Sequence, residues 1–148
     1  MSDMEKSLSA EFDTIVKAFD FDGQMAENCQ NLLLVVDSEM DDFAAYYWDY
    51  WINFATTDQL KDTDYLAQMI KSTAHYIRER MRDIKGTAWR EYLKAQIIAA
   101  CKDRVPLGHL LAASTRASLR YFDIIDARLN ANDPARDQLF KTVHDFTS

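Results

Sequence analysis

The chain has 148 residues, of which 48% are apolar, and this is enough material for the core of one domain. Three glycines and two prolines are too few for the many turns of a sandwich, a barrel or a doubly wound sheet. The net charge of −7 disfavours nucleic-acid binding, which needs basic side chains to displace phosphate counterions. We therefore expect a single domain over residues 1–148 that binds no nucleic acid.

The N-terminal half shows the apolar spacing of helices. The spacing predicts one helix over Ser9–Phe21 and a second over Gln24–Val36. The second ends in a continuous apolar run, which would also suit a strand, but no partner strand is visible elsewhere in the sequence. Ser38 and Asp41 have the spacing of a capping box, so a third helix is expected to start there.

The third predicted helix carries seven aromatic residues between positions 43 and 54. Buried Tyr and Trp side chains need polar partners, so this helix is expected to face more than a dry aliphatic core. An exposed face at Trp48 and Trp51 would instead indicate an interaction module without a cavity. Five of the aromatic residues form one stripe at helical spacing: Phe43, Tyr47, Tyr50, Trp51 and Phe54.

The C-terminal half predicts four more helices, separated by Gly, Pro and Asp signals. Pro106 is expected to begin a long helix, and Asp133 is expected to cap the last one, which opens at Pro134. Together these patterns predict an all-α fold of about seven helices. The expected ranges before the last helix are Asp64–Ile84, Ala88–Lys102 and Pro106–Leu129.

No catalytic motif is recognisable. The sequence has no glycine-rich phosphate loop, no nucleophile elbow and no paired histidines at zinc spacing, so we expect no enzyme and no metal site. His75 and His144 are expected at the surface, whereas His109 is a candidate for lining a cavity. Cys29 and Cys101 lie far apart, and Cys101 is expected to be a buried structural thiol.

The sequence also indicates where the protein works. No run of residues is long and apolar enough for a membrane helix, and the N-terminus has no secretory signal pattern. Two unpaired cysteines are typical of a reducing compartment. A cytoplasmic protein without membrane attachment is therefore expected.

Three short motifs carry a family resemblance. An extra helix precedes Gly23, Tyr47 follows Ala44-Ala45-Tyr46, and Val105-Pro106 opens a long apolar helix. In this order they resemble the globin domain of bacterial globin-coupled sensors, over nearly the whole chain. The resemblance implies a globin-like fold with an extra N-terminal helix, in which Tyr47 matches the tyrosine on the distal side of the heme.

The position of the heme ligand departs from that family. Sensor globins bind heme iron through a His about six residues before the Pro, and Ala100 stands there in this chain. A methyl group cannot bind iron, so the chain looks more like the heme-free sensor-globin domains of bacterial stress and sporulation regulators. The alternative is a heme-binding oxygen sensor with an unusual axial ligand: Cys101, Tyr47 or His75.

The resemblance therefore implies a heme-free sensory domain of a bacterial signalling protein, without a cofactor. Its cavity is packed with side chains, or it binds an apolar ligand such as a fatty acid. A ligand there would bias the packing of the last two helices. The residues expected to line the cavity are Tyr47, Trp51, Met69, Thr73, Ala100 and Leu110.

The same resemblance implies a homodimer in which the last two helices form an antiparallel four-helix bundle. A shift in that bundle would reach a C-terminal output domain or a partner signalling protein. The chain is accordingly expected to be a domain excised from a longer protein. The residues expected at the dimer interface are Ala112, Ala113, Ser118, Ile124, Leu139 and Val143.

Overall fold

The computed structural model describes residues 2–20, 22–54 and 58–147. Within these ranges the chain is helical and contains no strand, which confirms the prediction of an all-α protein. No helix in the described ranges is long and apolar enough to cross a membrane. The globin-like arrangement of the helices stays a prediction.

The first helix, α1, covers Asp3–Phe19 and so begins earlier than the sequence pattern predicts. Its early start follows from a capping box: the Glu5 amide donates to the Ser2 hydroxyl at 3.1 Å, and the Ser2 amide donates to the Glu5 carboxylate at 3.3 Å. The predicted end of this helix, Phe21, lies outside the described residues.

The next helix, α2, covers Met25–Val36 and includes the apolar run that also suited a strand. The predicted capping box after it is not seen. Residues Asp37–Glu39 instead form a 3₁₀ turn, η1, and α3 follows over Met40–Phe54. The Ser38 hydroxyl accepts a hydrogen bond from Arg128 at 2.5 Å, so this side chain joins two distant segments.

The C-terminal half agrees closely with the predicted ranges. A 3₁₀ turn, η2, over Asp58–Lys61 leads to α4, whose first turn is capped by the Asp62 carboxylate. The last helix begins after Asp133, whose carboxylate accepts from the Ala135 amide at 2.9 Å, as predicted. The four helices are α4 (Thr63–Arg82), α5 (Ala88–Lys102), α6 (Leu107–Arg128) and α7 (Ala135–Thr147).

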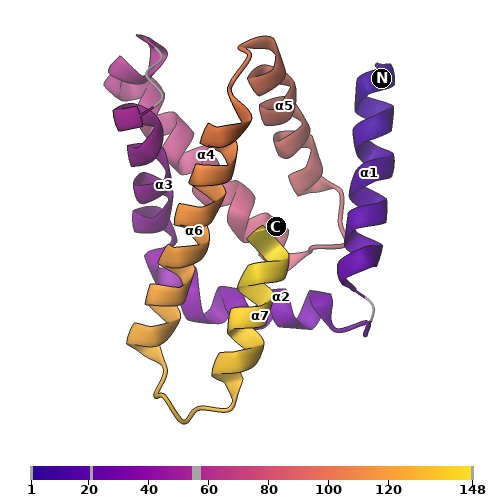
Figure 1. The fold of residues 1–148 in the computed structure, drawn as a ribbon, viewed down its shortest axis with the longest axis vertical. Coiled ribbons are helices and arrows are strands. Elements are labelled where there is room, and N and C mark those ends of the chain that lie inside the picture. The colour runs from indigo at the N-terminus through magenta and orange to yellow at the C-terminus, as the bar shows by residue number, and fades with distance from the viewer. Residues whose placement is uncertain (1, 21, 55–57, 148) are drawn as a thin grey trace.

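Two ends of the molecule differ in how tightly they are packed. In Figure 1, α2 crosses behind α6 and α7, and α7 returns alongside α6, whereas α1 stands at the outer edge with α5 between it and α6. We call the region around α2, α7, the end of α4 and the last turns of α6 the closed end. Its most buried side chains are Leu32, Val36, Met81, Ile125 and Val143, each at most 1% exposed.

The residues predicted at a dimer interface need correction. Ala113, Ile124, Leu139 and Val143 are 2%, 3%, 5% and 0% exposed within the single chain, so a second copy has no access to them. Apolar spacing found an apolar stripe, but this stripe holds α6 and α7 against the rest of the molecule. Ala112 and Ser118 are half-buried, and the Ser118 hydroxyl is hydrogen-bonded to Thr147 at 2.6 Å.

Candidate functional site

A cavity of about 850 Å³ lies between the helices away from the closed end. Its walls come from α1, α3, α4, α5 and α6 as far as Tyr121, and Met25 of α2 and the last turn of α7 also line it. We call this region the open end, because side chains at the cavity wall reach solvent: Phe54 is 62% and Leu110 is 37% exposed. A volume of this size suits a small organic ligand.

Aromatic side chains with polar tips dominate one wall. The indole of Trp48 on α3 donates to the Thr73 hydroxyl on α4 at 2.8 Å, and that hydroxyl is also bonded to the Tyr92 hydroxyl on α5 at 3.1 Å. The ring of Tyr92 stacks on Tyr76 with 4.8 Å between centroids. One threonine therefore joins three helices at the cavity wall.

The neighbouring part of α3 places Tyr47 and Trp51 at the cavity and holds a histidine of α6 there. The Tyr50 hydroxyl lies 2.6 Å from Nδ1 of His109 on α6, so this bond fixes the imidazole at the wall. The indole Nε1 of Trp51 is buried and makes no well-formed hydrogen bond, although it lies close enough to the Tyr47 hydroxyl for a weak one. Burial also raises the pKa of Tyr47, which keeps that phenol protonated and neutral.

The deeper part of the cavity contains a cation. The guanidinium of Arg80 on α4 donates to the Tyr76 hydroxyl and to the backbone carbonyl of Phe146 on α7, both at 3.1 Å. It lies over the rings of Trp89 and Phe146, 4.9 Å and 4.2 Å from their centroids. Arg80 therefore connects the cavity wall to the last turn of α7.

The helix α1 forms the outer wall through few contacts. Phe12 meets Trp89 with 5.9 Å between ring centroids, and Asp13 pairs with Arg90 at 2.5 Å. At the other end of α1, Asp20 pairs with Lys85 at 2.8 Å. The apolar face of α1 otherwise meets the cavity, and Ile15 on that face is 46% exposed.

The structure brings together most of the residues that the sequence assigned to the cavity. Tyr47, Trp51, Thr73, Ala100 and Leu110 line it, whereas Met69 does not. Met69 is half-buried elsewhere on α4.

Sequence reasoning missed the wall that α1 supplies and the cation at Arg80. The apolar spacing of α1 shows which face is apolar but not that it meets a cavity. No pattern in the sequence distinguishes Arg80 from the other basic residues near the end of α4.

The histidines and cysteines are distributed unequally around the cavity. His109 lines it, whereas His75 and Cys101 are exposed and lie outside the lining. The prediction that Cys101 is a buried thiol is therefore wrong. No group of three or more metal-ligating side chains gathers anywhere in the described ranges.

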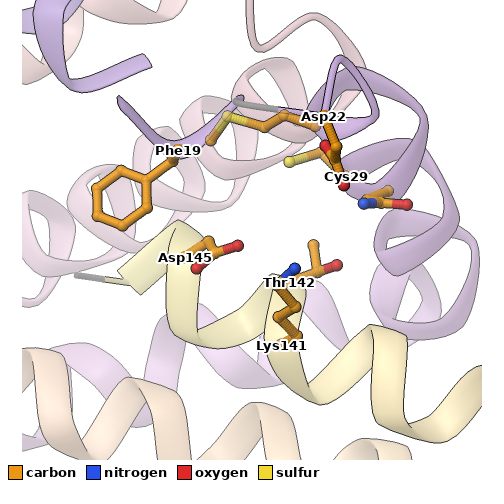
Figure 2. Close-up of a pocket in the computed structure, with 8 residues that line it drawn as sticks. Phe19, Asp22, Cys29, Lys141, Thr142 and Asp145 are labelled. Carbon is orange, nitrogen blue, oxygen red and sulfur yellow. The ribbon is translucent and has the colours of Figure 1, made fainter. Parts of the chain in front are cut away.

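A second, much smaller pocket lies at the closed end. Figure 2 shows Asp22, Cys29, Thr142 and Asp145 around it. Its volume of about 10 Å³ is comparable with the space needed by one water molecule, so it cannot hold an organic ligand. Burial raises the pKa of the Cys29 thiol to about 11, which makes this cysteine unreactive near neutral pH.

No known protein family matches the chain, and no curated protein or solved structure matches it either. The function must therefore be argued from the cavity itself. The cavity offers an apolar aromatic surface, hydroxyl and indole groups, one imidazole, and the half-buried cation of Arg80 beside the exposed Arg104. This set suits non-covalent binding of a ligand that has both apolar and polar parts.

Proposed function

We propose that this protein is a sensory or regulatory domain that binds a small, largely apolar ligand in the open end. The single observation that carries the proposal is the cavity of about 850 Å³ with its aromatic walls. The cavity is open to solvent at Phe54 and Leu110, so its apolar walls face water unless a ligand covers them, and covering apolar surface is favourable. A bound ligand would provide this cover.

Unmatched polar groups at the wall support the same conclusion. The buried Nε1 of Trp51 makes no well-formed hydrogen bond, only a weak one to the Tyr47 hydroxyl, although buried donors in folded proteins are nearly always fully satisfied. A carbonyl or hydroxyl oxygen of a ligand would accept from it. The ligand is therefore expected to carry at least one oxygen on an otherwise apolar body.

The site is positioned to change the last two helices. Leu110 and Ser114 of α6 line the cavity, as do Phe146 and Thr147 of α7. A ligand that contacts both helices favours one arrangement of them over another by its difference in affinity. We propose that this change is transmitted to a partner signalling protein or to an output domain that follows α7.

A homodimer through α6 is part of this proposal, with a different set of side chains from those first expected. Leu107, Leu111 and Leu119 are exposed on α6 at 68%, 60% and 56%. They are free of the core contacts that occupy Ile124 and Val143. The resemblance to heme-free sensor globins supports both the sensory role and the use of these helices.

Replacing either of two alanines on α5 by tryptophan tests ligand binding. Ala100 lines the cavity, whereas Ala95 is exposed and does not. The neutral dye N-phenylnaphthylamine is expected to bind the wild-type protein and to fluoresce there. Ala100→Trp should fill part of the cavity and weaken the binding of the dye about tenfold, whereas Ala95→Trp should leave it unchanged. Failure of the wild-type protein to bind the dye would overturn the proposal.

Heme-based sensing is a second candidate function, and His109 is the observation that favours it. Among the described lining residues it is the one histidine, and the bond from Tyr50 to its Nδ1 fixes the ring as ligating histidines usually are fixed. In the tautomer whose Nδ1–H donates to Tyr50, the lone pair of Nε2 would be available to iron. Bound heme would supply gas binding at that metal.

An absorption spectrum after addition of hemin and removal of the excess separates the two candidates. Heme sensing predicts a Soret band that persists in wild type and in His75→Ala but is lost in His109→Ala. A flat spectrum in the wild-type protein leaves the heme-free domain as the function.

A further inference from the structure

The cation in the cavity has no acidic partner. No carboxylate in the described ranges lies within 4 Å of the Arg80 guanidinium, although Arg90, on the next helix, pairs with Asp13 at 2.5 Å. Arg80 is half-buried, and charges that are withdrawn from water in folded proteins are usually paired. The arginines for which the structure shows an acidic partner are Arg78, Arg82, Arg90, Arg116, Arg128 and Arg136.

The hydrogen bonds of Arg80 are also incomplete. A guanidinium has five N–H groups, and here one terminal nitrogen donates to Tyr76 and the other to the carbonyl of Phe146. The Nε atom is buried and has no acceptor. The side chain therefore has donors in reserve at the place where the cavity reaches α7.

The surroundings compensate only part of the positive charge. The carboxyl end of α7 carries about half a unit of negative charge, and the rings of Trp89 and Phe146 present their electron-rich faces. Asp145 also lines the cavity, but it forms no ion pair with Arg80 in the structure. An anion that enters the cavity would complete the compensation.

We infer that the ligand is an amphipathic anion and that Arg80 binds its acidic head group. The head group is a carboxylate or a phosphate, because these accept two parallel hydrogen bonds from a guanidinium. The aromatic walls formed by α3 and α5 take the apolar body. This inference rests on the proposed function, since it names the chemical class of the ligand for the same cavity.

The position of Arg80 links anion binding to the last turn of α7. The guanidinium that would bind the anion also donates to the Phe146 carbonyl, which belongs to the last turn of α7. A head group that draws the guanidinium toward itself weakens that bond. Ligand binding is thereby coupled to the end of the chain segment proposed to carry the signal.

Two dyes of nearly the same shape test the inference. Anilinonaphthalene sulfonate is anionic, and N-phenylnaphthylamine is its neutral counterpart. Arg80→Met, which keeps an apolar stem against Trp89 and Phe146, should weaken binding of the anionic dye by about tenfold or more and change the neutral dye less than about twofold. Arg80→Lys should retain most of the affinity for the anionic dye.

Two further arginines serve as controls. Arg82 is exposed on the same helix, pairs with Glu79 and lies outside the cavity lining. Arg104 lines the cavity but is exposed to solvent. Arg82→Met should bind the anionic dye as the wild type does, and Arg104→Met should weaken binding less than Arg80→Met does. The inference is overturned if Arg104→Met, rather than Arg80→Met, loses affinity for the anionic dye. It is also overturned if Arg80→Met weakens the binding of both dyes equally.

A displacement experiment on the wild-type protein avoids any loss of folding in the variants. Decanoate and decyl phosphate should both displace N-phenylnaphthylamine at lower concentrations than decanol does, and the more effective anion identifies the head group. Decanol displacing the dye as well as either anion would overturn the inference, with the apolar cavity unaffected. No binding of the neutral dye at all would instead overturn the proposed function.

Discussion

The closed end and the open end share α4 and α6, but they are built from different kinds of side chain. At the closed end, aliphatic residues such as Leu32 and Ile125 are completely buried. At the open end, α3, α4 and α5 present tyrosines and tryptophans whose hydroxyl and indole groups form bonds across the cavity wall. Side chains fill the closed end completely, whereas at the open end they line a cavity.

This difference separates the source of stability from the source of function. Burial of aliphatic side chains contributes most of the favourable free energy of folding, and this contribution is concentrated at the closed end. The open end forgoes part of this contribution, because Phe54, Leu107 and Leu110 remain exposed. A ligand that fills the cavity would recover it, so the stability of the open end is expected to depend on binding.

The largest expected effect comes from shortening a leucine at the closed end. Leu32 is 0% exposed, and Leu34, two positions later on α2, is 81% exposed. Leu32→Ala should lower the free energy of unfolding by about 2–5 kcal/mol, because it opens a cavity in packed surroundings. Leu34→Ala should change it by less than about 0.5 kcal/mol. Urea unfolding followed by circular dichroism measures both.

Equal losses for the two leucine variants would contradict the comparison. They would mean that α2 is loosely held on both faces and that the closed end is not the stable core. The slope of the unfolding free energy against urea concentration in the wild type is the reference. A variant with a different slope would have an altered unfolded state rather than a lost contact.

A smaller effect is expected from two tryptophans at the open end. The Trp48 indole donates to Thr73, whereas the buried indole nitrogen of Trp51 makes only a weak contact with the Tyr47 hydroxyl. Trp48→Phe loses a full hydrogen bond, and Trp51→Phe loses only this weak contact. Trp48→Phe should therefore be less stable than Trp51→Phe by about 1–2 kcal/mol in thermal or urea unfolding of the ligand-free protein.

This pair also sharpens the role of the cavity. If Trp51 donates to a ligand oxygen, Trp51→Phe should weaken ligand binding even though it destabilises the free protein little. A stability loss in Trp51→Phe as large as that in Trp48→Phe would show that Nε1 of Trp51 does make a full hydrogen bond in the folded chain.

The helices were predictable from the sequence, and the open cavity was not. Apolar spacing and Pro or Asp signals located α5 and α7 closely, because these signals act within a few residues along the chain. The capping box at Ser2 was missed, so the start of α1 was placed too late. The predicted box at Ser38 was wrong, because Arg128 from a distant helix takes the hydroxyl.

The residues around the cavity were partly predictable for the same reason. The unusual aromatic content of α3 indicated a face with polar partners, and Tyr47 and Trp51 do line the cavity. Periodicity shows which face of a helix is apolar but not what that face meets. Val143 was therefore placed at an interface between copies, although it packs inside one chain.

The smallest expected effect concerns how α1 is held against the open end. A hydrogen bond from Arg90, together with its charge, lowers the pKa of Asp13, and a hydrogen bond from Lys85, with one from the Met25 amide, lowers the pKa of Asp20. Because these folded-state pKa values lie below the unfolded value near 3.8, the contacts stabilise the attachment of α1 above that pH. This stabilisation is lost as the pH falls through the lower folded-state values.

The protection of α1 amides against hydrogen exchange, taken relative to the intrinsic rate at each pH, should therefore fall below about pH 4 before protection at the closed end does. Asp13→Asn should accelerate exchange in α1 modestly at neutral pH as well, because the ion pair with Arg90 is removed there. Glu11→Gln, which changes a carboxylate on the same helix, is the control and should have a smaller effect. If α1 and α2 instead lose protection together, the two ends unfold as one unit, and the closed end is not stable without the open end.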